Sequence, residues 1–166
     1  MGYGEDGVAH LFTRALDQIE GQSLAGTEDA SLPFWAPDGR SLGFFAQRRL
    51  KRIDLDGGPP RTLAEVADAR GGSWGRDSTI VFAPNPGDGL YRIPANGGTP
   101  AVVTRLDASH AESSHRWPAF LPDGQTVLYL ALSGERERYG VQGVSLASPQ
   151  PRALFAADSG ALWLDG

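Results

Sequence analysis

Short apolar runs separated by turn-forming residues make up most of this chain. The clearest runs hold three or four residues and are 42–45, 80–82 and 127–130. Glycine, proline, aspartate and asparagine are frequent between them. Short runs bounded by such residues are typical of β-strands, and no helical periodicity of useful length accompanies them. The pattern predicts an all-β fold.

The same order of turn and strand recurs three times along the chain. Each copy places an aromatic residue three positions before an aspartate and an apolar run after it. The aspartates Asp38, Asp77 and Asp123 are 39 and then 46 residues apart. A second turn, Asp56-Gly57-Gly58, is repeated 40 residues later as Asn96-Gly97-Gly98, and 144–151 is a weaker third copy. Such regular repetition indicates a repeat architecture.

Each copy can be interpreted as four short antiparallel strands. A tight turn at the aspartate joins the first two strands, and the Gly-Gly turn joins the last two. Four strands every ~40–45 residues is the period of a β-propeller blade. The residues expected to build these turns are Asp38, Gly39, Asp77, Asp123, Gly124, Gly57, Gly58, Gly97 and Gly98. The second copy, Gly75-Arg76-Asp77-Ser78, lacks proline and glycine, so we expect it to bend differently.

The segment Trp35-Ala36-Pro37-Asp38-Gly39, followed by an apolar strand and an Asp-x-x-Gly-Gly hairpin, resembles the WD40-like (PD40) repeat of TolB and its relatives. Residues 114–118 also resemble propeller sensor segments of bacterial serine/threonine kinases. The resemblance covers roughly residues 10–160. It implies a β-propeller, a bacterial origin and a periplasmic or envelope location. Propellers of this type serve many roles, so the resemblance does not identify one function.

Counting strands predicts one propeller domain over 1–166 that is incomplete at both ends. Residues 10–25 match the last two strands of a blade, 31–64, 72–104 and 116–156 are complete blades, and 160–166 is the first strand of a further blade. Closed propellers typically have ~4–8 blades. Three arrangements remain open: a fragment of a larger ring, two copies that close one ring, and a compact four-bladed monomer.

Composition excludes several classes of function. Fifteen basic and twenty acidic residues give a formal charge of -5, which disfavours a nucleic-acid partner. The absence of cysteine excludes disulfides and cysteine-ligated metals. No stretch approaches the ~18 apolar residues of a membrane span. The first six residues lack the basic and apolar regions of a signal peptide.

No motif predicts catalysis, a metal site or a cofactor. Gly71–Gly75 matches Gly-x-Ser-x-Gly, but a turn and a strand follow it, so we interpret Ser73 as a strand residue rather than a nucleophile. The repeated aspartates are interpreted as turn residues rather than as acid/base groups. No phosphate-binding loop, zinc-binding helix or EF-hand spacing is present. The sequence therefore predicts a non-catalytic chain.

Binding residues are predicted on the propeller face opposite the aspartate turns, because the loops there vary in length and varying loops often bind ligands. The candidates are His110, His115, Arg116 and Arg138. The histidine pair near Glu112 could bind a metal, but we favour a polar loop in which His115 and Arg116 hydrogen-bond neighbouring blades.

Two further groups of residues have alternative interpretations. The basic run 48–52 is expected to be a solvated turn and strand, with an anchor for an acidic partner as the alternative. Tryptophans are expected to pack between sheets rather than to stack on a ligand; they are Trp35, Trp74, Trp117 and Trp163.

The predicted function is a scaffold that binds a protein or peptide, within a larger ring or in a ring closed by self-association into a homodimer. The alternative is the gating propeller of a prolyl-oligopeptidase-like serine hydrolase whose catalytic domain is not in this chain. A propeller lyase or glycosidase is disfavoured, because the first-strand positions lack acidic residues.

Overall fold

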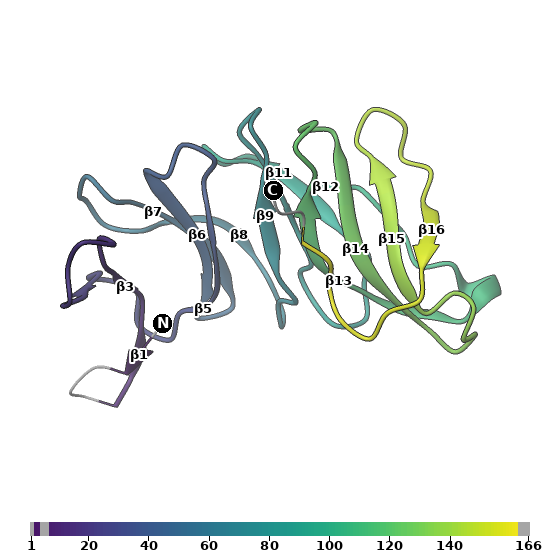
Figure 1. The fold of residues 1–166 in the computed structure, drawn as a ribbon, viewed down its shortest axis with the longest axis horizontal. Helices are drawn as coiled ribbons and strands as arrows, with labels where there is room; N and C mark the ends of the chain where they lie inside the picture. Colours follow the sequence, from purple (N-terminus) through teal and green to yellow (C-terminus); the bar gives the residue numbers. More distant parts are fainter. Residues whose placement is uncertain (1, 4–6, 163–166) are drawn as a thin grey trace.

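The computed structural model describes residues 2–3 and 7–162, and its regular elements are β-strands with one short 3-10 helix (Figure 1). Sheet 1 contains β5 (Ser31–Trp35), β6 (Ser41–Ala46), β7 (Arg49–Asp54) and β8 (Arg61–Glu65). Sheet 2 contains β9 (Gly72–Trp74), β10 (Thr79–Phe82), β11 (Tyr91–Pro94) and β12 (Ala101–Val102). Sheet 3 contains β13 (Glu112–Phe120), β14 (Thr126–Ser133), β15 (Gly140–Ser145) and β16 (Arg152–Phe155). Within each sheet every strand pairs antiparallel with its sequence neighbour. The prediction of an all-β fold of four-stranded antiparallel sheets is confirmed.

The N-terminal part forms two small sheets. β3 (Phe12–Thr13) pairs with β4 (Gln22–Ser23), and β1 (Gly2–Tyr3) pairs with β2 (Ala9–His10). The second pairing was not predicted from the sequence. Residues 160–162, where the last predicted strand begins, have irregular backbone, and 163–166 lie outside the described residues. The described residues contain no helix that could cross a membrane.

The hydrophobic core lies between the sheets, which stand side by side in a row (Figure 1). β10 shows why its sequence is continuously apolar. Ile80 and Phe82 pack in the core between sheets 1 and 2, whereas Val81 packs in the core between sheets 2 and 3. Side chains alternate between the two faces of a strand, so a strand covered on both faces is apolar at every position. Burying each such side chain contributes about 1.5–3 kcal/mol.

The first strands of the three sheets lie next to one another, with β9 packed against both β5 and β13. Each has a residue with left-handed backbone six positions before the turn aspartate: Leu32 (φ 49°), Gly71 (φ 104°) and Trp117 (φ 50°). In β5 and β13 a β-bulge lies at this point. The Trp117 amide donates to the Arg70 carbonyl at 2.8 Å, which joins sheets 2 and 3. The kink therefore repeats with the blade and accompanies contact between neighbouring inner strands.

Ser73 has a structural contact in β9. Its hydroxyl oxygen accepts a hydrogen bond of 3.1 Å from the Phe120 amide of β13. The residue lies in a strand that continues into a turn and another strand, rather than at a strand-to-helix elbow. The Ser73 hydroxyl thus links the inner strands β9 and β13.

In each aspartate turn the carboxylate accepts a hydrogen bond from the backbone amide two residues later. Asp38 accepts from the Arg40 amide at 2.9 Å and Asp77 from the Thr79 amide at 3.0 Å, while Asp123 accepts from two amides. In the second copy Ser78 (φ 63°) occupies the left-handed position that Gly39 (φ 70°) occupies in the first and Gly124 (φ 67°) in the third. The second turn is one residue shorter than the first. The Gly75 amide donates to the Thr79 carbonyl, four residues later, whereas the Ala36 amide donates to the Ser41 carbonyl, five residues later. The second turn thus differs in length and keeps the left-handed bend.

The glycines of the second turn also have positive φ. The values are 122° at Gly57, 95° at Gly58, 98° at Gly97 and 141° at Gly98.

The tryptophans do not all pack between sheets. Trp74 is buried between sheets 1 and 2, where the Arg52 guanidinium lies 5.2 Å from its ring. Trp35 is 55% exposed, so the prediction is wrong for this residue. Trp117 is 39% exposed and lies against Gly71 beside sheet 2, and Trp163 lies outside the described residues. Trp35 holds the position in sheet 1 that Trp74 holds in sheet 2. It is exposed because only the pair β3–β4 precedes sheet 1 there, instead of a four-stranded sheet.

Ser78→Gly should stabilise the protein by roughly 0.5–1 kcal/mol, because glycine adopts positive φ without the clash that a Cβ causes. Gly124→Ser should destabilise it by about 1 kcal/mol at the equivalent position of the third turn. The measurement is urea unfolding of both variants beside the native chain. Changes of the same sign in both variants would contradict the shared turn geometry.

Candidate binding site

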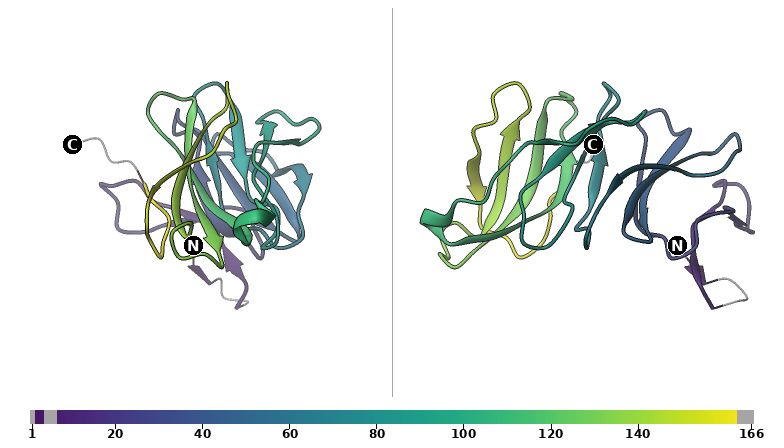
Figure 2. Two further views of the ribbon diagram at one scale, coloured as in Figure 1. Left: turned by 90° about the vertical axis from the view of Figure 1, so that its right-hand side faces the viewer. Right: turned by 180° about the vertical axis from the view of Figure 1, so that it is seen from behind.

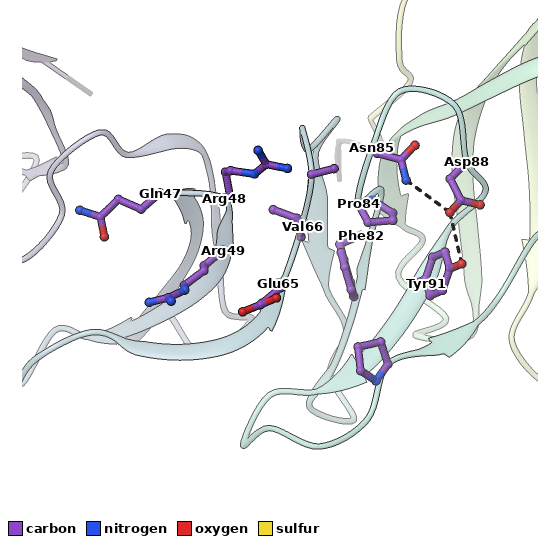
Figure 3. Close-up of a pocket in the computed structure, with 12 residues that line it drawn as sticks. Gln47, Arg48, Arg49, Glu65, Val66, Phe82, Pro84, Asn85, Asp88 and Tyr91 are labelled. Atoms are coloured by element: carbon purple, nitrogen blue, oxygen red, sulfur yellow. Dashed lines mark hydrogen bonds between the residues drawn. The ribbon is translucent and has the colours of Figure 1, made fainter.

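A groove of about 650 Å³ opens between sheets 1 and 2 on the face opposite the aspartate turns (Figure 3). This face carries the β6–β7 and β10–β11 loops and the connections between sheets. The groove is lined by Gln47, Arg48, Arg49, Glu65, Val66, Ala67, Phe82, Pro84, Asn85, Asp88, Tyr91 and Pro100. Three segments of this face, 47–50, 65–72 and 84–89, contribute most of these residues.

One wall of the groove is a strained hairpin turn. Ala46 pairs with Arg49, which leaves Gln47 (φ 53°) and Arg48 (φ 59°) as a two-residue loop with left-handed backbone at both positions. Such loops favour Asn-Gly, and each non-glycine residue in this conformation costs on the order of 1–3 kcal/mol. The Val66 amide holds the turn by donating to the Arg48 carbonyl at 2.9 Å. Strain of this kind is concentrated at functional sites, which makes the turn a candidate binding element.

The opposite wall is built around the Asp88 carboxylate. It accepts hydrogen bonds from the Tyr91 hydroxyl at 3.2 Å, the Asn85 amide at 3.4 Å and the Gly89 backbone amide at 2.8 Å. Burial, and then the Asp88 charge, raise the pKa of Tyr91, which keeps its hydroxyl protonated as a donor. The Tyr91 ring lies 6.3 Å from that of buried Phe82. These contacts hold the wall in one arrangement before any ligand binds.

His110 and Arg138, two predicted binding residues, contact each other in sheet 3 and its preceding loop. His110 follows two other residues in the short 3-10 helix η1 (Ala108–His110), beside the β14–β15 loop. Its Nδ1 lies 2.6 Å from Asp107 Oδ2, and its Nε2 lies 3.1 Å from Arg138 Nη2. An arginine only donates, so Nε2 accepts and the proton of the neutral ring is on Nδ1. Hydrogen bonds from Ser109 and then His110 lower the pKa of Asp107 to about 2.

His115 is fully buried and therefore does not lie on the binding face. Its Nδ1 is 2.7 Å from the Thr104 hydroxyl, and its Nε2 is 3.1 Å from Glu112 Oε2. Glu112 also accepts from the Gln142 side chain at 2.9 Å, and Gln142 accepts from the Tyr129 hydroxyl at 2.9 Å. Thr104 follows sheet 2, so this buried network joins sheets 2 and 3.

The network also reaches the groove, because the His115 amide donates to the Asp88 carbonyl at 3.1 Å. Arg116 is half-buried, and its Nε donates to Ser114 at 2.8 Å within β13. None of the four predicted residues lines the groove. Among the described residues, no three or more histidine, aspartate or glutamate side chains are arranged to hold a metal ion.

Apart from the basic run, no groove residue was singled out individually from the sequence as a candidate for binding. Arg48 and Arg49 belong to the run that was considered as an acidic-partner anchor. Asp88 and Tyr91 come from a single loop and the strand after it, and no motif marks them. They face Arg48 only because sheets 1 and 2 stand side by side.

A second cavity, of about 400 Å³ and mostly apolar, lies at the kinked inner strands. It is lined by the kink residue and its successor from each sheet, Leu32-Pro33, Gly71-Gly72 and Trp117-Pro118, together with 159–162. The segment after β16 thus runs back to the inner strands, as Figure 2 also shows. The chain's own C-terminal segment forms one side of this cavity.

No family model and no curated protein matches the chain. Solved β-propeller structures resemble it. A TolB of Agrobacterium tumefaciens is 21% identical with a TM-score of 0.59, over 74% of this chain and 44% of that protein. A chain of the nidogen/laminin complex is 13% identical with a TM-score of 0.67, over 86% of this chain and 55% of that one. Oligogalacturonate lyase in complex with manganese is 17% identical with a TM-score of 0.67, over 86% of this chain and 46% of that protein.

The chain spans about half the length of these similar proteins. Identities this low show the fold alone. The predicted β-propeller fold is confirmed, and the sheets described above are its blades.

Burial lowers the pKa of His115 below its ordinary value of 6.5, and this effect exceeds the opposite effects of Glu112 and Asp88. Below about pH 6.5 the unfolded chain therefore binds a proton on His115 that the folded protein does not bind. The free energy of unfolding consequently decreases as the pH is lowered through this range. We expect the free energy of unfolding to decrease between about pH 7 and pH 5, and His115→Gln to remove most of that decrease. The measurement is urea unfolding at several pH values.

His110→Gln, which keeps His115, is the control and should keep the dependence. An undiminished dependence in His115→Gln would contradict the prediction. Should that variant fail to fold, an NMR titration of the His115 ring in the native protein decides, since a midpoint above 6.5 would exclude a lowered pKa.

Proposed function

We propose that this chain is a non-catalytic β-propeller segment that binds a protein or peptide on its loop face and completes its ring with further blades. The observation that carries the proposal is the groove between sheets 1 and 2. It combines an exposed, strained basic turn with an aromatic and acidic wall that internal hydrogen bonds hold in place. A preformed groove reduces the ordering that a ligand must induce on binding.

Protein binding is also the role of the nidogen/laminin complex, whose fold is similar to that of this chain. The similarity to a lyase does not transfer catalysis, because at 17% identity it extends only to the fold. The hydroxyl of Ser73 and the carboxylates of Asp38, Asp77 and Asp123 make structural hydrogen bonds. These contacts support the scaffold interpretation.

Exposed apolar side chains at both ends of the array support ring completion. Trp35 is exposed beside the two-stranded β3–β4 sheet, and Leu154 and Phe155 of β16 are 51% and 56% exposed. Further blades would cover these faces as sheets 1–3 cover one another. They can come from a longer chain or from a second copy of this one.

Binding on the loop face can be located by NMR. A pool of random peptides added to the isotope-labelled protein should shift the amide signals of 47–50 and 84–91. Signals of 38–40 and 123–125 on the turn face are the internal control and should stay unchanged. Shifts confined to the turn face, or no shifts at saturating peptide, would contradict the proposal.

Self-association can be measured by light scattering across a dilution series. If a second copy completes the ring, the mass should approach twice the 17.6 kDa of one chain and decrease on dilution. Trp35→Glu and Leu154→Glu should weaken the association at least tenfold, because each places a charge on an apolar face. Val102→Glu, at an exposed position of the central sheet, is the control. A folded monomer at every concentration would exclude the second copy.

A further inference from the structure

We propose that the groove between sheets 1 and 2 binds an extended peptide segment through an acidic side chain that pairs with the guanidinium of Arg48. This inference rests on the proposed function and names the chemistry of the partner. It depends on which charged groups around the groove already have a partner within the protein and which do not.

One of the two acidic groups of the groove already has partners. Three hydrogen bonds, from Tyr91, Asn85 and Gly89, occupy the Asp88 carboxylate. Glu65 lies directly opposite Arg49 in the β7–β8 register, but no ion pair joins these two described side chains, so one of the two arginines beside it can balance its charge and the other is left over. A basic ligand group would compete with these contacts.

Arg48 is the charge without a partner that is directed across the groove. Within the described residues its side chain has no ion pair and no hydrogen bond, and the same holds for Arg49 and Glu65. Figure 3 shows the side chain extending from the turn toward Pro84 and Asn85 on the opposite wall, whereas Gln47 and Arg49 extend away. Arg105 lies near enough to Tyr91 for its charge to oppose the rise in the tyrosine's pKa. It therefore adds a positive charge to that wall. A planar guanidinium directed across a groove can hold a carboxylate with two parallel hydrogen bonds.

The remaining lining suits the body of a peptide. Tyr91, Pro84 and Pro100 offer apolar and aromatic contact, and buried Phe82 lies behind them. The groove runs between two sheets and is open to solvent, so it can take an extended chain more readily than a compact ligand. The partner is therefore an extended peptide with an acidic residue. Because the net charge of this chain is -5, the attraction must come from the local charge of the groove and not from the protein as a whole.

The experiment selects binders from a random peptide library against the native protein and against Arg48→Gly. The substitution relieves the left-handed strain at Arg48 (φ 59°), so it should not unfold the protein and any loss of binding reflects the lost side chain. Selected peptides are then synthesised in pairs that differ by Glu or Gln at the enriched position, and their affinities are measured by fluorescence anisotropy at low and high salt.

We expect acidic residues to be enriched against the native protein and not against Arg48→Gly. The Glu peptide should bind about tenfold more tightly than its Gln partner, with the difference lost in Arg48→Gly and reduced by salt. Two controls separate local pairing from other causes. Ser78→Gly relieves the same kind of strain on the turn face, and Arg76→Ala removes one positive charge there; neither should change the preference.

Three results would overturn the inference. Peptides that bind the loop face with no difference between Glu and Gln would refute the acidic contact while leaving the proposed function intact. An equal loss in Arg76→Ala would show that overall charge, rather than Arg48, sets the preference. Recovery of no peptide by either protein would contradict the inference and the proposed function together.

Discussion

The sheets of this protein are apolar on both faces, and each must therefore be covered on both sides. Sheet 2 meets this requirement fully, because Ile80 and Phe82 pack against sheet 1 and Val81 packs against sheet 3. A strand with this sequence would expose several large apolar side chains if its sheet stood alone. The row of sheets follows from that constraint, and so do the kinked inner strands that bring the sheets close together. The same constraint explains the exposed Trp35, which lies where the covering sheet has only two strands.

Polar contacts then join the sheets at particular points. The buried network of Thr104, His115 and Glu112 connects sheet 2 to sheet 3, and every polar group in it has a partner. Burial of polar groups is tolerated only when they are hydrogen-bonded, and a satisfied network favours one arrangement of its surroundings. Because the His115 amide also bonds the Asp88 carbonyl, the order of this network extends to a wall of the groove. The site is thus supported by interactions well away from its surface.

The groove combines one rigid wall with one strained wall. The β6–β7 turn keeps Gln47 and Arg48 in a conformation that Asn-Gly would adopt with less strain. Glycine would adopt this conformation at position 48 without strain, so the arginine lowers the stability of the turn. Ser78 has a similar backbone conformation in a turn on the other face, where it lines a pocket of about 400 Å³ with Arg52 and Trp74.

Sequence alone determined the three four-stranded sheets, their turns and the propeller architecture. Those features are local and repeated: an aspartate that bonds its own turn, as at Asp38 and Asp123, leaves the same pattern in every copy. The candidate site was predicted less well. His115 was predicted as a binding residue in a loop that varies in length, yet it is buried in β13, where Thr104 from the segment after sheet 2 and Glu112 from the same strand lie within hydrogen-bonding distance of its ring. Trp35 and Trp74 occupy equivalent positions in the repeat, and only the sheet in front of each decides which is buried. Likewise, Arg48 and Asp88 are forty residues apart in sequence and face each other only across two packed sheets. Tertiary structure decided these points because burial and the pairing of charges depend on neighbours that the local sequence does not contain.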